Sequence, residues 1–216
     1  EPPGPVVTES ASVALEGRNL HLWRGDRHVL KGLHFAAGPG EALHVRGPNG
    51  VGKTTLLRTL AGFLWPEEGE LYWMGRRTTE DRDVYAAALT YLGHENAMKA
   101  DLTPRENLRY LSGIRHATTP AQVDAALERL GVTGQRDLPC RALSAGQRRR
   151  VSMARVLLAR AKLWLLDEPF TNLDVTGVRD LSGLIADHVR AGGMTILTAH
   201  AELTLPGVEL RRLELA

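Results

Sequence analysis

The chain has 216 residues, of which 43% are hydrophobic and 24% are charged, a composition that excludes disordered and fibrous proteins and predicts a globular core. Its 27 lysine and arginine residues nearly balance 25 aspartate and glutamate residues, so the net charge of +2 does not indicate a nucleic-acid-binding protein. No apolar run approaches the roughly 18 residues of a membrane span, and we expect no signal peptide. The single cysteine, Cys140, favours a reducing compartment such as the cytosol.

The first third of the chain predicts two antiparallel strands and then a strand, a turn and a helix. Hydrophobic residues alternate with polar ones at 20–22 and again at 33–35, and residues 25–26 form a glycine-containing turn between them. A short apolar run at 43–45 precedes a glycine-rich turn. After this turn, residues 54–61 place leucines on one face of a helix.

The middle of the chain, roughly 100 to 142, predicts a small group of helices. Two segments begin with the same helix-start pattern, in which a threonine is followed by a proline and, three positions after the threonine, by a glutamate or glutamine. These residues are Thr103, Pro104 and Glu106, and Thr119, Pro120 and Gln122. Unbroken apolar runs at 163–166 and 194–197 follow, separated by a long helical pattern, and such runs are typical of buried strands in a parallel sheet.

Residues 47–54 match the phosphate-loop pattern G-x-x-x-x-G-K-[ST], and the predicted strand and helix flank them as the pattern requires. The glycines let backbone N–H groups converge on phosphate oxygens at the positive end of the helix dipole. We expect Lys53 to reach the β and γ phosphates and the Thr54 hydroxyl to ligate Mg²⁺. The alternative is a tight glycine turn that ends in Lys-Thr by chance, against which the whole pattern and its flanks argue. The predicted phosphate-loop contacts are Gly47, Pro48, Asn49, Gly50, Val51, Gly52, Lys53, Thr54 and Thr55.

Two carboxylates follow the predicted strand at 163–166 and complete a phosphate site. Asp167 is expected to hold Mg²⁺ through its coordination shell, and Glu168 to act as general base on the attacking water. A solvated strand end before Pro169 is the alternative. Alone the pair is a weak signal, but together with the phosphate loop it is a strong one.

Residues 143–147 precede a helical pattern and allow two interpretations. Ser144 and Gln147 stand in capping-box relation, so the turn could serve only to start a helix. The same geometry also presents a hydroxyl and exposed N–H groups at a helix N-terminus, an anion site that could receive a γ-phosphate.

From about residue 13 to the C-terminus these motifs resemble an ABC-type ATPase. Residues 143–147, Leu-Ser-Ala-Gly-Gln, are similar to the family signature Leu-Ser-Gly-Gly-Gln; residues 171–174 resemble the D-loop, and His200 resembles the switch histidine. The resemblance implies an α/β fold of the P-loop NTPase class, with a RecA-like parallel-sheet core, an N-terminal antiparallel β-subdomain and an inserted α-helical subdomain.

The resemblance also implies that two subunits form a head-to-tail homodimer, in which each ATP lies between the phosphate loop of one and the signature turn of the other. One subunit alone would then bind ATP but hydrolyse it poorly. The expected contacts from the second subunit are Ser144, Ala145, Gly146 and Gln147, with Asp174 of the D-loop. The expected catalytic residues are Lys53, Glu168 and His200, the last contacting the γ-phosphate and helping to fix the water.

The expected domain organisation is a tail followed by one ATPase domain. Residues 1–12 contain three prolines and a glycine without a period and predict a flexible tail. Residues 13–216 are expected to form the single ABC ATPase domain, with 13–94 and 156–216 as nucleotide-binding core and β-subdomain and 95–155 as helical subdomain.

Two positions depart from the family pattern. The Q-loop position, after a strand predicted at 88–92, is Glu95 instead of glutamine, and we expect Glu95 to contact Mg²⁺ or its water. The loop that usually supplies an aromatic ring for adenine offers Arg24 with Trp23 beside it, and either could stack on the base. The three arginines at 148–150 are interpreted as a solvated basic face.

Within the family, three stretches resemble the ATP-binding subunits of cytochrome c maturation transporters, which are haem-handling complexes of bacterial inner membranes. The stretches are 91–94 with 99–108, 143–155 and 163–171. This resemblance implies a peripheral subunit on the cytoplasmic face of the membrane that uses ATP to drive integral membrane subunits. It implies only an indirect relation to haem and no nucleic-acid partner.

Three alternatives remain at this stage. A transporter subunit for another solute would share every motif. A non-transport ABC protein acting on DNA or ribosomes usually carries long coiled-coil insertions or two fused ATPase units, which do not fit this length. A small-molecule P-loop kinase would share residues 47–54 but would have no use for residues 143–147.

Overall fold

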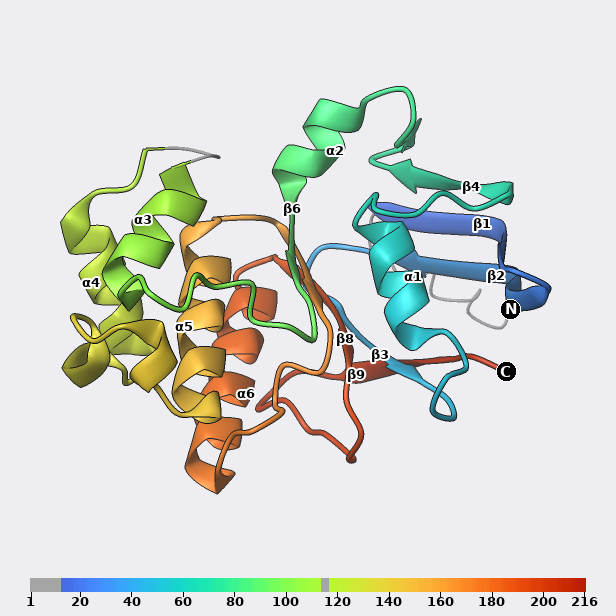
Figure 1. Cartoon of the computed structure of the whole chain (residues 1–216). Coiled ribbons are helices and arrows are strands. Elements are labelled where there is room, and N and C mark those ends of the chain that lie inside the picture. The colour runs from blue at the N-terminus through green and yellow to red at the C-terminus, as the bar shows by residue number, and fades with distance from the viewer. Residues whose placement is uncertain (1–12, 114–116) are drawn as a thin grey trace, which may run out of the picture.

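The computed structural model describes residues 13–113 and 117–216, so the predicted tail at 1–12 lies outside the described residues. Within these ranges the chain forms a four-stranded antiparallel sheet and a five-stranded parallel sheet (Figure 1). This arrangement confirms the predicted α/β class, with a parallel core and an N-terminal antiparallel part.

The antiparallel sheet has the strand order β2-β1-β4-β5. Its strands are β1 (Leu15–Arg24), β2 (Arg27–Ala37), β4 (Glu68–Trp73) and β5 (Arg76–Arg77). The predicted hairpin is confirmed, because β1 and β2 pair directly across the two-residue turn at 25–26, where Gly25 has a φ of +61°.

The parallel sheet has the order β6-β7-β8-β3-β9. Its strands are β3 (Ala42–Arg46), β6 (Leu89–Leu92), β7 (Leu163–Leu166), β8 (Met194–Thr198) and β9 (Leu210–Glu214). The predicted strand at 88–92 begins one residue later, because Ala88 ends a short helix, α2 (Arg82–Ala88). Since all five strands run the same way, the segments that follow β3, β7 and β8 emerge at one edge of the sheet.

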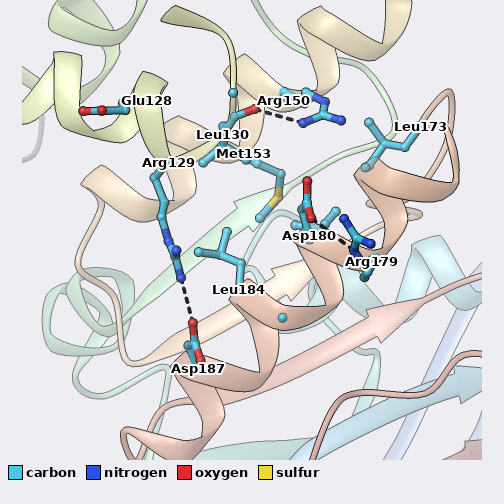
Figure 2. A pocket seen from close by; sticks show the side chains of 14 residues that line it. Glu128, Arg129, Leu130, Arg150, Met153, Leu173, Arg179, Asp180, Leu184 and Asp187 are labelled. Atoms are coloured by element: carbon cyan, nitrogen blue, oxygen red, sulfur yellow. Dashed lines mark hydrogen bonds and ion pairs between the residues drawn. The ribbon is translucent and has the colours of Figure 1, made fainter.

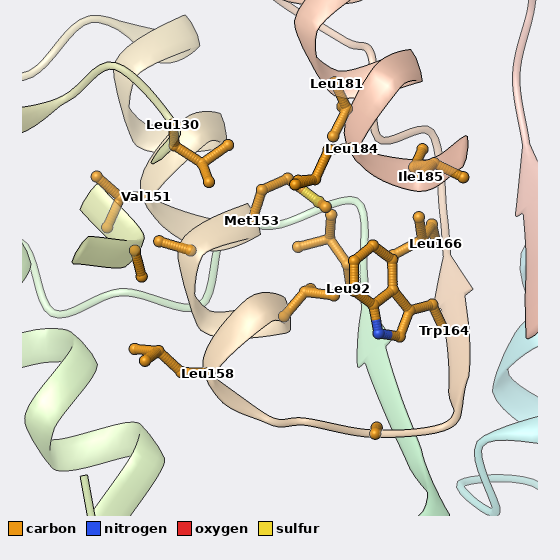
Figure 3. Close-up of a cluster of buried hydrophobic side chains, with 14 of the residues drawn as sticks. Leu92, Leu130, Val151, Met153, Leu158, Trp164, Leu166, Leu181, Leu184 and Ile185 are labelled. Carbon is orange, nitrogen blue, oxygen red and sulfur yellow. The ribbon is translucent and has the colours of Figure 1, made fainter. Parts of the chain in front are cut away.

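Both faces of the parallel sheet are buried, which explains why its strands are apolar without alternation. In β7, Leu163 and Leu165 join a cluster that contains the leucines of α1 (Lys53–Leu60), between the two sheets. Their neighbours Trp164 and Leu166 face the opposite way, into a second cluster with α5 (Ala145–Leu158) and α6 (Val175–Arg190), part of which Figure 3 shows. Successive side chains of a strand point to opposite faces, so one strand anchors both layers.

Three helices pack together beside the core: α3 (Pro104–Gly113), α4 (Pro120–Arg129) and α5. The two predicted helix starts are confirmed. Thr119 and Gln122 form a reciprocal capping box, and Thr103 and Glu106 make the same pair of contacts. None of the helices in the described ranges is long and apolar enough to cross a membrane.

A cavity of about 440 Å³ lies between α4, α5 and α6 (Figure 2). An ion pair of 2.8 Å from Arg129 to Asp187 joins α4 to α6 at this cavity. None of the phosphate-loop residues lines it, so it is separate from the site at the carboxyl edge of the sheet.

Candidate active site

The phosphate loop connects β3 to α1 in a conformation that requires glycine. Gly47, Gly50 and Gly52 have φ values of +143°, +78° and +125°, which residues with a side chain rarely adopt. A Cβ atom on Gly47 would lie 2.6 Å from the carbonyl oxygen of Leu215, and one on Gly52 would lie 2.4 Å from Cγ1 of Val29. Gly52 is the N-cap of α1 and supplies no side-chain cap, so the first N–H groups of the helix have no side-chain acceptor there.

Lys53 extends back over the loop that precedes it. Its Nζ donates hydrogen bonds to the carbonyl oxygens of Gly47, at 2.8 Å, and Pro48, at 3.1 Å. Lys53 and His200 line the same cavity, of about 530 Å³, together with Gly47 and Asn49. The sheet thus brings together two residues that are almost 150 positions apart in the sequence, in a cavity whose lining is mostly polar.

Asp167 has one carboxylate oxygen that is satisfied and one that is not. The side chain is 1% exposed, and its Oδ1 accepts a hydrogen bond of 2.8 Å from Oγ1 of Thr198. Its Oδ2 is buried and has no hydrogen-bond partner among the described residues. An unpaired buried carboxylate oxygen is costly, and it is the kind of ligand that Mg²⁺ prefers.

A magnesium ion at Asp167 would need ligands besides acidic side chains. In residues 13–113 and 117–216 no group of three or more His, Cys, Asp or Glu side chains could hold a metal ion by itself. The Thr54 hydroxyl is exposed at the start of α1 and could complete the coordination with phosphate oxygens and water. The donor set therefore fits a cation that binds together with a phosphate ligand.

Glu168 follows Asp167 with its backbone in the left-handed region, at φ +50°. For a residue other than glycine this conformation costs on the order of 1 kcal/mol. The Glu168 N–H donates to Oγ1 of Thr198 at 2.9 Å, and Nε2 of His200 lies 2.8 Å from Oε1 of Glu168. The predicted general base and the predicted switch histidine are therefore in direct contact.

Comparison with known proteins places these features in a family. Residues 30–171 match the ABC transporter family. A cytochrome c biogenesis ATP-binding export protein, CcmA, from Dechloromonas aromatica is 45% identical over 204 residues, which cover 93% of this chain and 99% of that protein. The CcmA 2 protein of Salmonella paratyphi A is 45% identical over 201 residues, covering 93% and 96%. The chain belongs to the ABC transporter family.

Solved structures agree with this assignment. A protein from Pyrococcus furiosus that is assigned to the ABC transporter ATP-binding proteins matches with a TM-score of 0.81 and 26% identity, covering 93% of this chain and 96% of that one. The chain is therefore an ATP-binding subunit of an ABC transporter with the α/β P-loop NTPase fold that the sequence predicted.

In this ABC subunit the signature turn forms the N-terminus of α5. Ser144 Oγ accepts a hydrogen bond of 3.1 Å from the Gln147 N–H, and Oε1 of Gln147 accepts one of 2.8 Å from the Ser144 N–H. The helix-start interpretation is confirmed, while the contact with a second subunit's ATP stays a prediction. A Cβ on Gly146 would lie 2.6 Å from the Asn172 carbonyl oxygen, so glycine lets the turn approach the D-loop closely.

The D-loop of this ABC subunit ends in a helix cap. Oδ1 of Asp174 accepts a hydrogen bond of 2.8 Å from the Gly177 N–H at the start of α6 and lies 3.4 Å from Nη2 of Arg150. Arg150 also donates to the Leu130 carbonyl oxygen at 3.1 Å (Figure 2). Asp174 therefore stabilises its own helix, and its predicted role across a dimer interface remains a prediction.

The prediction of a solvated basic face at 148–150 is wrong. Arg149 is 2% exposed and donates to the carbonyl oxygens of Gly93, Asp167, Glu168 and Pro169 at 2.8, 2.7, 2.7 and 3.2 Å. Burial lowers the pKa of its guanidinium, while the charges of Asp167 and Glu168 act to raise it. Three consecutive arginines on a helix point in different directions, so the run could not be assigned to one face.

The two candidates for the adenine contact differ in their surroundings. The Trp23 ring stacks on His28, with centroids 4.0 Å apart and planes 5° apart, so part of one indole face is covered. Arg24 is exposed at the end of β1. The adenine contact stays a prediction for both residues.

Glu95 lies exposed in the segment that follows β6, where the family has its Q-loop. If it contacts Mg²⁺ through water, the substitution Glu95→Gln removes a negative charge from the second coordination shell and should raise the Mg²⁺ concentration for half-maximal turnover on the order of tenfold. The measurement is a Mg²⁺ titration of ATPase rate, with Glu128→Gln on α4 as an exposed control. Equal titration curves for the two variants would remove Glu95 from the metal site.

Proposed function

We propose that this ABC subunit binds Mg-ATP at residues 47–55 and hydrolyses it in a dimer that drives membrane subunits. The observation that carries the proposal is the cluster at the carboxyl edge of the sheet. There the phosphate loop and Lys53 share a cavity with His200, which contacts Glu168. The residue before Glu168 is a buried aspartate with an unpaired carboxylate oxygen among the described residues. Such a cluster supplies phosphate binding, a cation ligand and a base, which are the parts that phosphoryl transfer to water needs.

In the proposed reaction, water attacks the γ-phosphorus and the bond from that phosphorus to the β-phosphate oxygen breaks, leaving ADP and phosphate. Glu168 accepts the proton of the water, and His200 moves from the Glu168 carboxylate to the γ-phosphate. The Lys53 ammonium gives up its hydrogen bonds to the carbonyl oxygens of Gly47 and Pro48 and donates to phosphate oxygens instead. Asp167 and Thr54 would hold Mg²⁺, which would neutralise part of the phosphate charge.

A second copy of the chain would supply the signature turn. The helix α1, which carries the phosphate loop, and the helix α5, which carries Ser144, pack on opposite faces of the parallel sheet (Figure 1). This separation supports closure of the site by a partner in head-to-tail orientation. Ser144, Ala145, Gly146 and Gln147 would then contact the γ-phosphate of the partner's ATP, at the N-terminus of α5.

We further propose that the transporter is a cytochrome c maturation system. Two relatives at 45% identity, each matched over at least 96% of its length, carry the name cytochrome c biogenesis ATP-binding export protein. In that function the subunit would dock on integral membrane subunits at the cytoplasmic face of the membrane. Haem would contact the membrane partners and would be related to this chain only indirectly.

Lys53→Ala should weaken ATP binding by about 10- to 100-fold, because a hydrogen-bonded charge on the phosphates is lost. Binding of a non-hydrolysable ATP analogue, followed by calorimetry, measures the effect. Lys31→Ala, an exposed lysine of β2, is the control and should bind as the wild type does. Wild-type affinity in the Lys53 variant would contradict the assignment of the loop.

The transporter function is tested by turnover and by partners. We expect ATPase rate to rise more steeply than protein concentration, because hydrolysis needs two copies, and to need no phosphoryl acceptor. Consumption of ATP only when a small-molecule acceptor is added would instead indicate a kinase.

The cytochrome c assignment is tested by the membrane proteins that co-purify with the chain. These proteins should include haem-chaperone machinery. Co-purification of a permease for another solute in their place would overturn the assignment.

A further inference from the structure

The carboxylate of Glu168 has a second histidine partner, on a different segment from the first. Nδ1 of His94 lies 3.5 Å from Oε2 of Glu168, while His200 contacts Oε1. The Glu168 side chain is 17% exposed, whereas the His94 and His200 side chains are 64% and 60% exposed. Each oxygen of the carboxylate thus faces one imidazole, and both imidazoles are largely exposed to solvent.

One buried side chain fixes the backbones of both partners in this contact. Arg149 donates through Nη1 to the carbonyl oxygens of Gly93 and His94, at 2.8 and 3.4 Å, and through Nη2 to those of Asp167 and Glu168, both at 2.7 Å. The guanidinium is planar and rigid, so it holds the two segments at a set spacing. The approach of His94 to Glu168 therefore rests on a buried network and not on the exposed imidazole alone.

The backbone of Glu168 is fixed in two ways. Its φ of +50° and the hydrogen bond from its N–H to Thr198 fix where the side chain starts. In the proposed reaction His200 turns to the γ-phosphate and leaves Oε1 free for the water. Among the residues that the structure describes, His94 is then the side chain that still contacts the carboxylate, at Oε2, the oxygen that does not take the proton.

We propose that His94 is a positioning residue, which holds Oε2 of Glu168 so that Oε1 is aimed at the attacking water. The proposal rests on the proposed hydrolysis by Glu168 and adds to it a residue that touches neither ATP nor the water. It also links the segment after β6 to the base, because Arg149 ties Gly93 and His94 to the backbone of Glu168.

The test compares three variants of His94 in the full chain, purified with the membrane proteins that accompany it. His94→Ala should lower kcat about fivefold with the KM for ATP unchanged, since one polar contact with an ionised group near the surface is lost. His94→Asn places an amide nitrogen where Nδ1 stands and should restore most of kcat. His94→Gln places its amide one bond further out and should not.

A double-mutant cycle separates positioning from a structural effect. If His94 acts through Glu168, then His94→Ala should add no further loss to single-turnover hydrolysis in a Glu168→Gln background. The control is His34→Ala, an exposed histidine of β2 in the other sheet, which should leave kcat and KM unchanged.

Three results would overturn the inference: wild-type kcat in His94→Ala, equal loss in all three variants, or full additivity with Glu168→Gln. Each of these leaves the proposed hydrolysis intact, since wild-type turnover is present. A wild-type protein that binds ATP but shows no turnover with its membrane partners would overturn the proposed hydrolysis and this inference with it.

Discussion

Replacing Glu168 with glutamine is expected to leave ATP bound and to lower its hydrolysis by about 10²- to 10⁴-fold, the range for loss of a general base. Glutamine has the shape of glutamate and keeps an oxygen that can accept a hydrogen bond from His200, so the site should still form. It cannot take the proton of the attacking water. Two copies of the variant should therefore stay closed on unhydrolysed ATP, which size-exclusion chromatography with Mg-ATP would detect as a stable dimer.

The matched control is Glu209→Gln, which removes an exposed carboxylate before β9. It should hydrolyse ATP as the wild type does and should show no added dimer. Wild-type turnover in the Glu168 variant would exclude Glu168 as the base. Loss of turnover without a trapped dimer would keep the base but contradict the head-to-tail assembly.

The elements that could be predicted from the sequence are those that local patterns specify. The phosphate loop is one contiguous segment, and its glycines are required by backbone conformation within that segment. The same holds for the hairpin turn at 25–26 and for the capping boxes of Thr119 and Ser144, whose partners stand three residues away. Such features need no knowledge of how the strands pair.

The residues that sequence analysis missed depend on the pairing of distant strands. Thr198 acts on Asp167 and Glu168 because β8 lies directly beside β7, with Leu166 opposite Leu197. The Thr198 hydroxyl at the end of the apolar strand β8 indicated a polar role. Only the register of β8 against β7 shows which carboxylate this hydroxyl reaches. His94 is placed in the same way, because β6 lies on the other side of β7.

Arg149 could not be recognised from its neighbours, since 148–150 is a uniform basic run. In the structure its carbonyl acceptors come from 93–94 and from 167–169, more than 50 residues before it and about 20 after it. A buried guanidinium needs hydrogen-bond acceptors from several segments at once. The spacing of charges along one helix does not show whether those segments lie nearby. Arg149 thereby joins α5 to the carboxyl ends of β6 and β7.

Arg149→Ala is expected to lower the free energy of unfolding by roughly 3–5 kcal/mol, the range for removing one partner from a buried ionic or hydrogen-bonded network. The substitution removes the guanidinium donor that the carbonyl oxygens of 93–94 and 167–169 share. Urea denaturation followed by circular dichroism measures the loss. Because the same carbonyls position Asp167 and Glu168, ATPase activity should fall under conditions in which the variant is still folded.

Two further variants distinguish the geometry of the guanidinium from its charge. Arg149→Lys keeps the positive charge, but a single ammonium cannot reach both segments as the planar guanidinium does, so we expect a loss of stability between that of alanine and wild type. Arg179→Ala removes an arginine of α6 whose side chain is 76% exposed, and it should change stability by less than about 0.5 kcal/mol. A loss in Arg149→Ala no larger than that in Arg179→Ala would show that the carbonyl network does not hold the two segments together. Full recovery in Arg149→Lys would show that charge alone suffices.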